Sequence, residues 1–117
     1  MNPVFQRTAR MIGEDGVELL ARKTAAVFGI GGVGSYAAEA LVRAGVGHLI
    51  FIDKDRVDVS NVNRQLVADV STFGRLKAEV MAERALRVNP DCDVKVLPAY
   101  YRPDDTSFIE NLHADFI

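Results

Sequence analysis

The sequence predicts an α/β fold: a Rossmann-like, doubly wound parallel sheet with an N-terminal helical segment. Three observations predict it. Apolar runs lack polar alternation, segments with helical periodicity lie between them, and glycines follow the first run directly. Alternating strands and helices over 117 residues are typical of a parallel sheet covered by helices. Residues 1–117 are therefore expected to form one domain or the first part of one.

Each element follows from a local pattern. Residues 5–22 mix apolar and charged residues at helical spacing, with glycines at 13 and 16, and predict one or two short helices. Strands are expected at residues 24–30, 48–53, 93–100 and 114–117, and helices at 35–45, 75–89 and 103–112. The chain stops within the fourth strand. We therefore expect a sheet that is truncated here and continues in a longer protein.

Bulk properties narrow the functional classes. A formal net charge of −2 gives no general basic field, so a nucleic-acid partner would have to be held by a local patch or by the other subunit of an oligomer. Cys92 is the single cysteine, which excludes an internal disulfide and fits a cytoplasmic protein; we expect it to be a small packed residue. No apolar run approaches the roughly 18 residues needed to cross a bilayer. His48 and His113 lack metal-ligand spacing, and no metal site is expected within the chain.

The glycines after the first strand indicate an anion site. Gly29, Gly31 and Gly34 form G-x-G-x-x-G between a strand and a helix, and Gly32 adds a fourth small position. By itself this loop favours a dinucleotide, with Asp53 at the end of the second strand placed to hold a ribose. A P-loop is excluded because no Gly-Lys-Ser/Thr follows. Glycines that serve only close packing remain an alternative.

The polar stretch after Asp53 does not resemble a dehydrogenase. It contains Asp55, Asn61, Asn63 and Arg64 in a loop outside the carboxyl ends of the strands, where ligands of parallel sheets bind. Arg64 is therefore expected near the phosphates. Asn61 serves equally well as a turn residue or as a ligand contact.

Lys77 is the more specific candidate. It lies in the first turn of the predicted helix, where the helix dipole disfavours a cation, and no acid lies three or four residues away. By contrast, Arg75 is spaced to pair with Glu79, and Glu83 with Arg87. An exposed lysine is the simple alternative. Beside a glycine loop and Arg64, we expect Lys77 to contact phosphate instead.

Four ordered motifs together resemble one known family. They are FQRTARMIG at residues 5–13, GIGGVGSYAAEALVRAGVG at 29–47, IDKDRVDVSNVNRQ at 52–65 and GRLKAEVMAERALRVNP at 74–90. These segments resemble the ATP-dependent adenylating enzymes that include the ubiquitin-activating, thiamine-biosynthesis and molybdopterin-synthase adenylyltransferases. Within that family the residues after the glycine loop and NVNRQL are most similar to the tRNA threonylcarbamoyladenosine dehydratase branch.

The resemblance implies roles for particular residues. Gly31, Gly32 and Gly34 cradle ATP, Asp53 holds the ribose, and Asn61, Arg64 and Lys77 lie beside the triphosphate. Arg7 matches an arginine that the family donates across a dimer interface, which implies a homodimer. A Mg²⁺-binding acid is expected past Ile117. Residues 1–117 alone are therefore expected to fold but not to adenylate a substrate.

The resemblance leaves the substrate open. The dehydratase branch implies tRNA as partner and ATP-dependent ring closure of a modified adenosine beside the anticodon. Activation of a ubiquitin-like sulfur-carrier protein is the alternative within the family. A non-catalytic nucleotide-binding module and a dinucleotide oxidoreductase are alternatives of other classes, and Arg64 and Lys77 disfavour the last.

Overall fold

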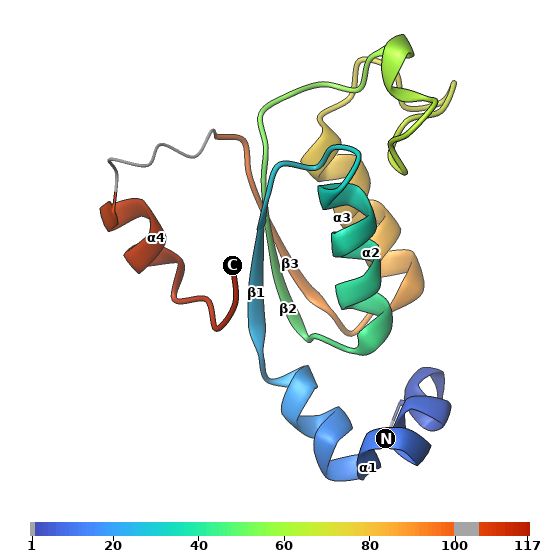
Figure 1. Cartoon of the computed structure of the whole chain (residues 1–117), viewed down its shortest axis with the longest axis vertical. Coiled ribbons are helices and arrows are strands. Elements are labelled where there is room, and N and C mark those ends of the chain that lie inside the picture. The colour runs from blue at the N-terminus through green and yellow to red at the C-terminus, as the bar shows by residue number, and fades with distance from the viewer. Residues whose placement is uncertain (1, 100–105) are drawn as a thin grey trace.

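The computed structural model describes residues 2–99 and 106–117 and contains a three-stranded parallel sheet with helices on both faces (Figure 1). The strands are β1 (Thr24–Phe28), β2 (His48–Ile52) and β3 (Asp93–Leu97). The helices are η1 (Pro3–Phe5), α1 (Gln6–Ala21), α2 (Gly34–Ala44), η2 (Val59–Asn61), α3 (Lys77–Val88) and α4 (Thr106–Leu112). Helices α2 and α3 cover one face, and α4 lies on the other. The predicted doubly wound class is confirmed.

The predicted fourth strand is present as a single bridge. Phe116 pairs in parallel with Ala25 on the free edge of β1, whereas β2 pairs with β1 on the other edge. The preceding residue, Asp115, also bonds to β1: its N–H donates to the Thr24 carbonyl, and its carboxylate accepts the Thr24 N–H. The order is therefore β3, β2, β1, Phe116. The direction of winding reverses beside β1, and ligands bind at such a reversal point.

Several element boundaries differ from the predictions. Strand β3 ends at Leu97, because the next N–H on the β2 side, that of Ala99, donates to the Leu97 carbonyl and not to β2; residue 100 of the predicted strand lies outside the described residues. Helix α3 begins at Lys77, since Arg56 and Leu76 form an antiparallel bridge that holds the preceding residues extended. Arg75 consequently lies before the helix and pairs with Glu83, so the predicted Arg75–Glu79 pair is wrong.

The helical ends of the chain match more closely. The N-terminal segment is a short 3-10 turn followed by α1, whose backbone breaks at Gly13 with φ 79° and ψ 162°. The interruption predicted at Gly13 is therefore confirmed. Of the helix predicted over 103–112, residues 103–105 lie outside the described residues, and the rest is α4. No helix in the described ranges is long and apolar enough to cross a membrane.

The core has two parts, one on each face of the sheet. Phe51, Leu49 and Met81 are fully buried between the sheet and helices α2 and α3. On the other face Ile50 and Ile52 pack beneath α4, in a smaller cluster. Cys92 is buried in the larger cluster, and burial raises the pKa of its thiol to about 11. A thiol with this pKa stays protonated at neutral pH, which supports the packing role predicted for Cys92.

Gly34 allows α2 to lie close to the loop that follows β1. A Cβ built on Gly34 would lie 1.7 Å from the Gly29 carbonyl oxygen, which is backbone and has little freedom to move. At Gly32 a Cβ would meet only Arg64 atoms, at 3.7 Å or more, which is ordinary contact. The fold therefore requires glycine at 34 but not at 32.

This difference gives a test of the fold. We expect Gly34→Ala to lower the free energy of unfolding by about 3 kcal/mol or more, because either the helix or the loop must shift. Gly32→Ala is the matched control and should stay within about 0.5 kcal/mol of wild type. Urea unfolding of the two variants measures both values. Equal stability of the two variants would contradict the packing described here.

Candidate phosphate-binding site

The carboxyl ends of β1 and β2 open into a cavity of about 710 Å³. The glycine loop, Asp53, Asp55 and Lys77 line its polar end, and the exposed edge of β1 lines its apolar end. In Figure 1 this end of the sheet is the upper one, with α1 at the opposite end of the molecule. The structure thus brings together glycine-loop and charged residues that sequence analysis placed near one ligand.

The glycine loop presents unpaired hydrogen-bond donors to the cavity. Among the described residues, the N–H groups of residues 31–34 have no hydrogen-bond partner, and the N-cap residue Val33 offers no capping side chain. Gly29 has φ +86°, which explains its identity. Gly31 and Gly32 have neither a positive φ nor a close contact that would exclude a Cβ. Close approach of an anionic ligand to the loop is the remaining reason for these two glycines.

Asp53 holds the glycine loop in place. Its side chain is buried, and one carboxylate oxygen accepts the Ile30 N–H at 2.7 Å while the other accepts the Asp55 N–H at 2.7 Å. The first bond ties the glycine loop to the end of β2, and the second fixes the turn that follows it. Sequence analysis gave Asp53 only a ligand role. The structure adds this positioning role, and each oxygen keeps a second lone pair for a ligand hydroxyl.

Two further polar residues position the loop and were not predicted as site residues. The Ser35 hydroxyl donates to the Gly31 carbonyl and accepts the Leu66 N–H, so it joins the loop to the segment after η2. Gln65 is buried beside Gly31, and its Oε1 has no partner within residues 2–99 and 106–117. The available signal was weak: a hydroxyl on the apolar face of a helix and an amide next to Arg64.

Asn61 performs the turn role that sequence analysis left open. It is buried, and its Oδ1 accepts the Asp58 N–H at 2.8 Å in a capping box over η2. The pKa of Asp58 lies below its ordinary value mainly because the Ser60 hydroxyl and N–H donate to it. Lys77 adds a smaller electrostatic contribution. Asn61 therefore shapes the segment that carries Arg64, and its contact with a ligand stays a prediction.

Arg64 and Lys77 approach the cavity in different ways. The Arg64 side chain is exposed, lies along Gly32 and donates to the Ser60 carbonyl at 3.1 Å. Lys77 is only 8% exposed, so the simple alternative of a solvated lysine is wrong. Its side chain makes no hydrogen bond or ion pair with another described residue, although its own N–H donates to the Asp55 carbonyl. Lys77 is thus a buried cation at a helix N-terminus, where the helix dipole disfavours it, and within the described residues its side chain has only a minor electrostatic interaction with Asp58.

Comparison with known proteins agrees with this geometry. The family model described as the ThiF family matches residues 5–117. The chain belongs to the ThiF family. The tRNA threonylcarbamoyladenosine dehydratase of Bacillus subtilis (strain 168) is 50% identical over 97 residues, which are 83% of this chain and 38% of that protein. The adenylyltransferase and sulfurtransferase UBA4 of Eremothecium gossypii is 40% identical over 101 residues, 80% of this chain and 23% of that protein.

A solved structure gives the same result for this ThiF-family chain. The E. coli tRNA N6-threonylcarbamoyladenosine dehydratase TcdA, crystallised in complex with ATP, superposes with a TM-score of 0.90 at 45% identity. The match covers 94% of this chain and 45% of that one. The resemblance and the Rossmann-like fold predicted from sequence are both confirmed. The chain spans less than half the length of these dehydratases.

Three polar side chains predicted for the ThiF-family site do not line the cavity: Asn61 and Arg64 lie beside it, and Arg7 lies farther away. Arg7 is exposed on α1, at the end of the sheet away from the glycine loop, so it cannot reach this cavity in its own chain. For a metal, the cavity offers the carboxylates of Asp53 and Asp55, and both Asp53 oxygens already accept backbone N–H groups. No group of three metal-ligating side chains occurs among the described residues.

The positioning role of Asp53 can be tested by an isosteric change. In Asp53→Asn the amide nitrogen cannot accept a hydrogen bond, so either the Ile30 or the Asp55 N–H loses its partner. We expect the free energy of unfolding to fall by about 1–3 kcal/mol. Asp93→Asn is the control, because the Asp93 carboxylate is exposed and pairs with the half-exposed His48, and it should change stability by less than about 1 kcal/mol. Unchanged stability of Asp53→Asn would show that these bonds do not hold the loop.

Proposed function

We propose that the complete protein is an ATP-dependent adenylating enzyme and acts as a tRNA threonylcarbamoyladenosine dehydratase. One observation carries the ATP assignment: Gly31, Val33, Gly34 and the buried Lys77 line one cavity, and among the described residues the N–H groups of residues 31–34 have no hydrogen-bond partner. A triphosphate supplies the anion that both lack. The dehydratase assignment rests on the names of relatives that are 45–50% identical to this chain.

In the proposed reaction a carboxylate oxygen of the substrate attacks the α-phosphorus of ATP. An oxygen–phosphorus bond forms to the carboxylate, and the bond to the leaving pyrophosphate breaks. Negative charge develops on the transferring group, and the loop N–H groups, Lys77 and Arg64 stabilise it. A neighbouring group of the same nucleoside then displaces AMP and closes a ring, so no enzyme thioester is needed. In these steps no side chain of the chain is a nucleophile, which agrees with the protonated Cys92 thiol.

The remaining site assignments are proposals of the same kind. Asp53 holds the ribose with the lone pairs that the backbone leaves unused, Asp55 lines the same cavity, and Asn61 contacts the nucleotide from the segment that carries Arg64. Arg7 reaches the triphosphate from a second copy of the chain, in a homodimer. Mg²⁺ bound to the phosphates neutralises charge on the leaving group. The acid that binds it lies beyond Ile117, and the enzyme is cytoplasmic.

Activation of a ubiquitin-like sulfur-carrier protein is the second candidate. It is supported by the 40% identity to UBA4, and it would use the same phosphate site. The candidates differ in the acceptor: a small protein ends in a free carboxylate on a flexible tail, whereas the dehydratase takes a modified tRNA. AMP formation stimulated by modified tRNA, and not by a sulfur-carrier protein, distinguishes them.

Lys77 gives the sharpest test of the proposed function. In Lys77→Met we expect tRNA-dependent AMP formation to fall about 100-fold or more, because a charge-assisted contact in the transition state is lost. Stability should hold or rise by up to about 1 kcal/mol, since a buried cation leaves a helix N-terminus. Lys95→Met is the control. Lys95 is exposed on β3, and the turnover of this variant should stay near that of wild type. Turnover of Lys77→Met near the wild-type rate would return Lys77 to a structural role.

A further inference from the structure

A second concave surface lies away from the nucleotide cavity. It is a hollow of about 400 Å³ where the ends of α2 and α3 meet the N-terminal turn. The residues that line it are Val4, Arg43, Arg84, Arg87 and Val88. We call it the arginine hollow. Its lining contains three guanidinium groups and no carboxylate, in a chain whose net charge is −2.

The positive charge of the arginine hollow is only partly compensated. Glu39 lies beside it, and its Oε2 contacts Arg84 at 2.7 Å and Arg43 at 3.7 Å. Arg87 has no ion pair with another described residue, and Glu83, one turn before it, is bonded to Arg75. Arg43, Arg84, Arg87 and Arg75 therefore share the two carboxylates of Glu39 and Glu83, which leaves a local charge of about +2 at neutral pH. Guanidinium groups collected in this way bind phosphate with paired donors.

Helix dipoles explain part of this arrangement but not all of it. Arg43 and Arg87 lie in the last turns of α2 and α3, where a cation is favourable. The dipole acts on each helix separately, however, and does not require the side chains of two helices to converge on one hollow. Arg84 lies one turn earlier and still contributes to the lining. The convergence is therefore a feature of the surface and not of either helix alone.

We propose that the arginine hollow binds the phosphate backbone of the tRNA substrate. The inference rests on the proposed function, and names the surface that receives the acceptor. Helix α2 begins at the glycine loop and ends at the hollow, and its 11 residues span roughly 16 Å. A nucleoside in the cavity would thus leave its flanking backbone within reach of the arginines. Phosphate contacts of this kind position an RNA and add affinity without reading its sequence.

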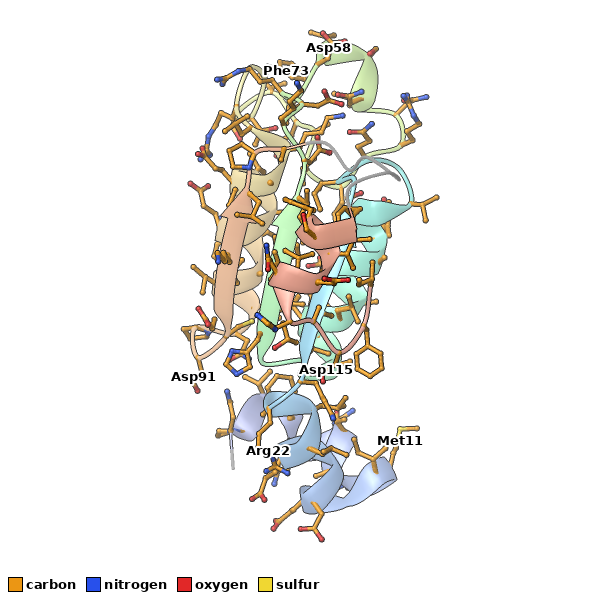
Figure 2. All side chains as sticks on the ribbon, turned by 90° about the vertical axis from the view of Figure 1, so that its left-hand side faces the viewer. Met11, Arg22, Asp58, Phe73, Asp91 and Asp115 are labelled. Atoms are coloured by element: carbon orange, nitrogen blue, oxygen red, sulfur yellow. The ribbon has the colours of Figure 1, made fainter. Side chains whose placement is uncertain are left out.

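The test compares paired charge removals in the complete protein. Arg43→Gln combined with Arg87→Gln removes two cations and leaves the Arg84–Glu39 pair intact. The control, Arg22→Gln combined with Lys95→Gln, removes two exposed cations elsewhere. Arg22 directly follows α1. Lys95 lies on the opposite face of the sheet from its neighbours Val94 and Val96, which pack under α2 and α3. Figure 2 labels Arg22 among the helices at the lower end of the molecule. Binding of tRNA is measured at several salt concentrations, and ATP binding is measured in parallel.

For the arginine pair, the variant that lacks Arg43 and Arg87, we expect tRNA affinity to fall roughly threefold to tenfold. The slope of log K against log salt concentration should decrease in magnitude by about 2. The affinity for ATP and the control pair should match wild type. Unchanged tRNA affinity, or an equal loss in the control pair, would overturn the proposal. So would a shift from dimer to monomer in sedimentation with an unchanged salt slope, because the hollow would then be a contact between copies.

Two further measurements distinguish tRNA binding at the hollow from binding of a small anion and from failure of the proposed function. Inorganic phosphate is titrated in place of tRNA while ATP is saturating; binding that the arginine pair abolishes would assign the hollow to a small anion and overturn the tRNA assignment. Wild-type protein that binds ATP but no tRNA would refute the proposed substrate itself, and the hollow with it. Wild-type tRNA binding with no response in the arginine pair refutes only the hollow.

Discussion

The site depends on one side chain with two hydrogen bonds. The Asp53 carboxylate accepts the Ile30 N–H and the Asp55 N–H, each at 2.7 Å, at the point where β2 ends. Through the first bond the glycine loop stays beside the sheet, and through the second the chain turns toward Arg64 and Lys77. The glycine loop and the segment that follows β2 are thus both positioned by one buried carboxylate. Asp53 thus satisfies the donors that fix the loop, whereas among the described residues the N–H groups of residues 31–34, beside the cavity, have no partner.

Several features of the site lower the stability of the ligand-free protein. Within residues 2–99 and 106–117, four consecutive N–H groups at the start of α2 have no partner, and a cation is buried at the start of α3. Each choice costs stability in the free protein, and a polyanion in the cavity would compensate both. Gly29 and Gly34 serve the backbone, whereas nothing in the packing requires glycine at 31 or 32. Such disagreement between fold and local preference is expected where binding determines the residue.

Sequence patterns predicted the architecture well because its signals are local. The apolar run at residues 24–30 and the helical stripe at 75–89 define their elements without knowledge of the neighbours. Boundaries were off where tertiary contacts decide them, as at Arg75, which the Arg56–Leu76 bridge keeps out of α3. The positioning roles of Asp53 and Ser35 could not be predicted, since their partners lie across the loop. The burial of Lys77 depends in the same way on how α3 approaches β2.

The arginine hollow could not be predicted from sequence either, because it depends on how two helices pack. Arg43 and Arg84 belong to different helices, and neither local sequence distinguishes them from ordinary arginines near helix ends. Only the packing of α2 against α3 brings them to one carboxylate, Glu39. A net charge of −2 had argued for a local patch if nucleic acid is the partner, and the hollow is a patch of that kind.

The central claim is that a substrate carboxylate attacks the α-phosphorus of ATP at this loop. The most direct measurement follows an oxygen atom. The complete protein is given tRNA whose threonylcarbamoyl carboxylate carries ¹⁸O, and the nucleotide products are analysed by mass spectrometry. Attack at the α-phosphorus followed by ring closure places the label in AMP. Label in orthophosphate, with ADP as the second product, would mean attack at the γ-phosphorus and would contradict the account.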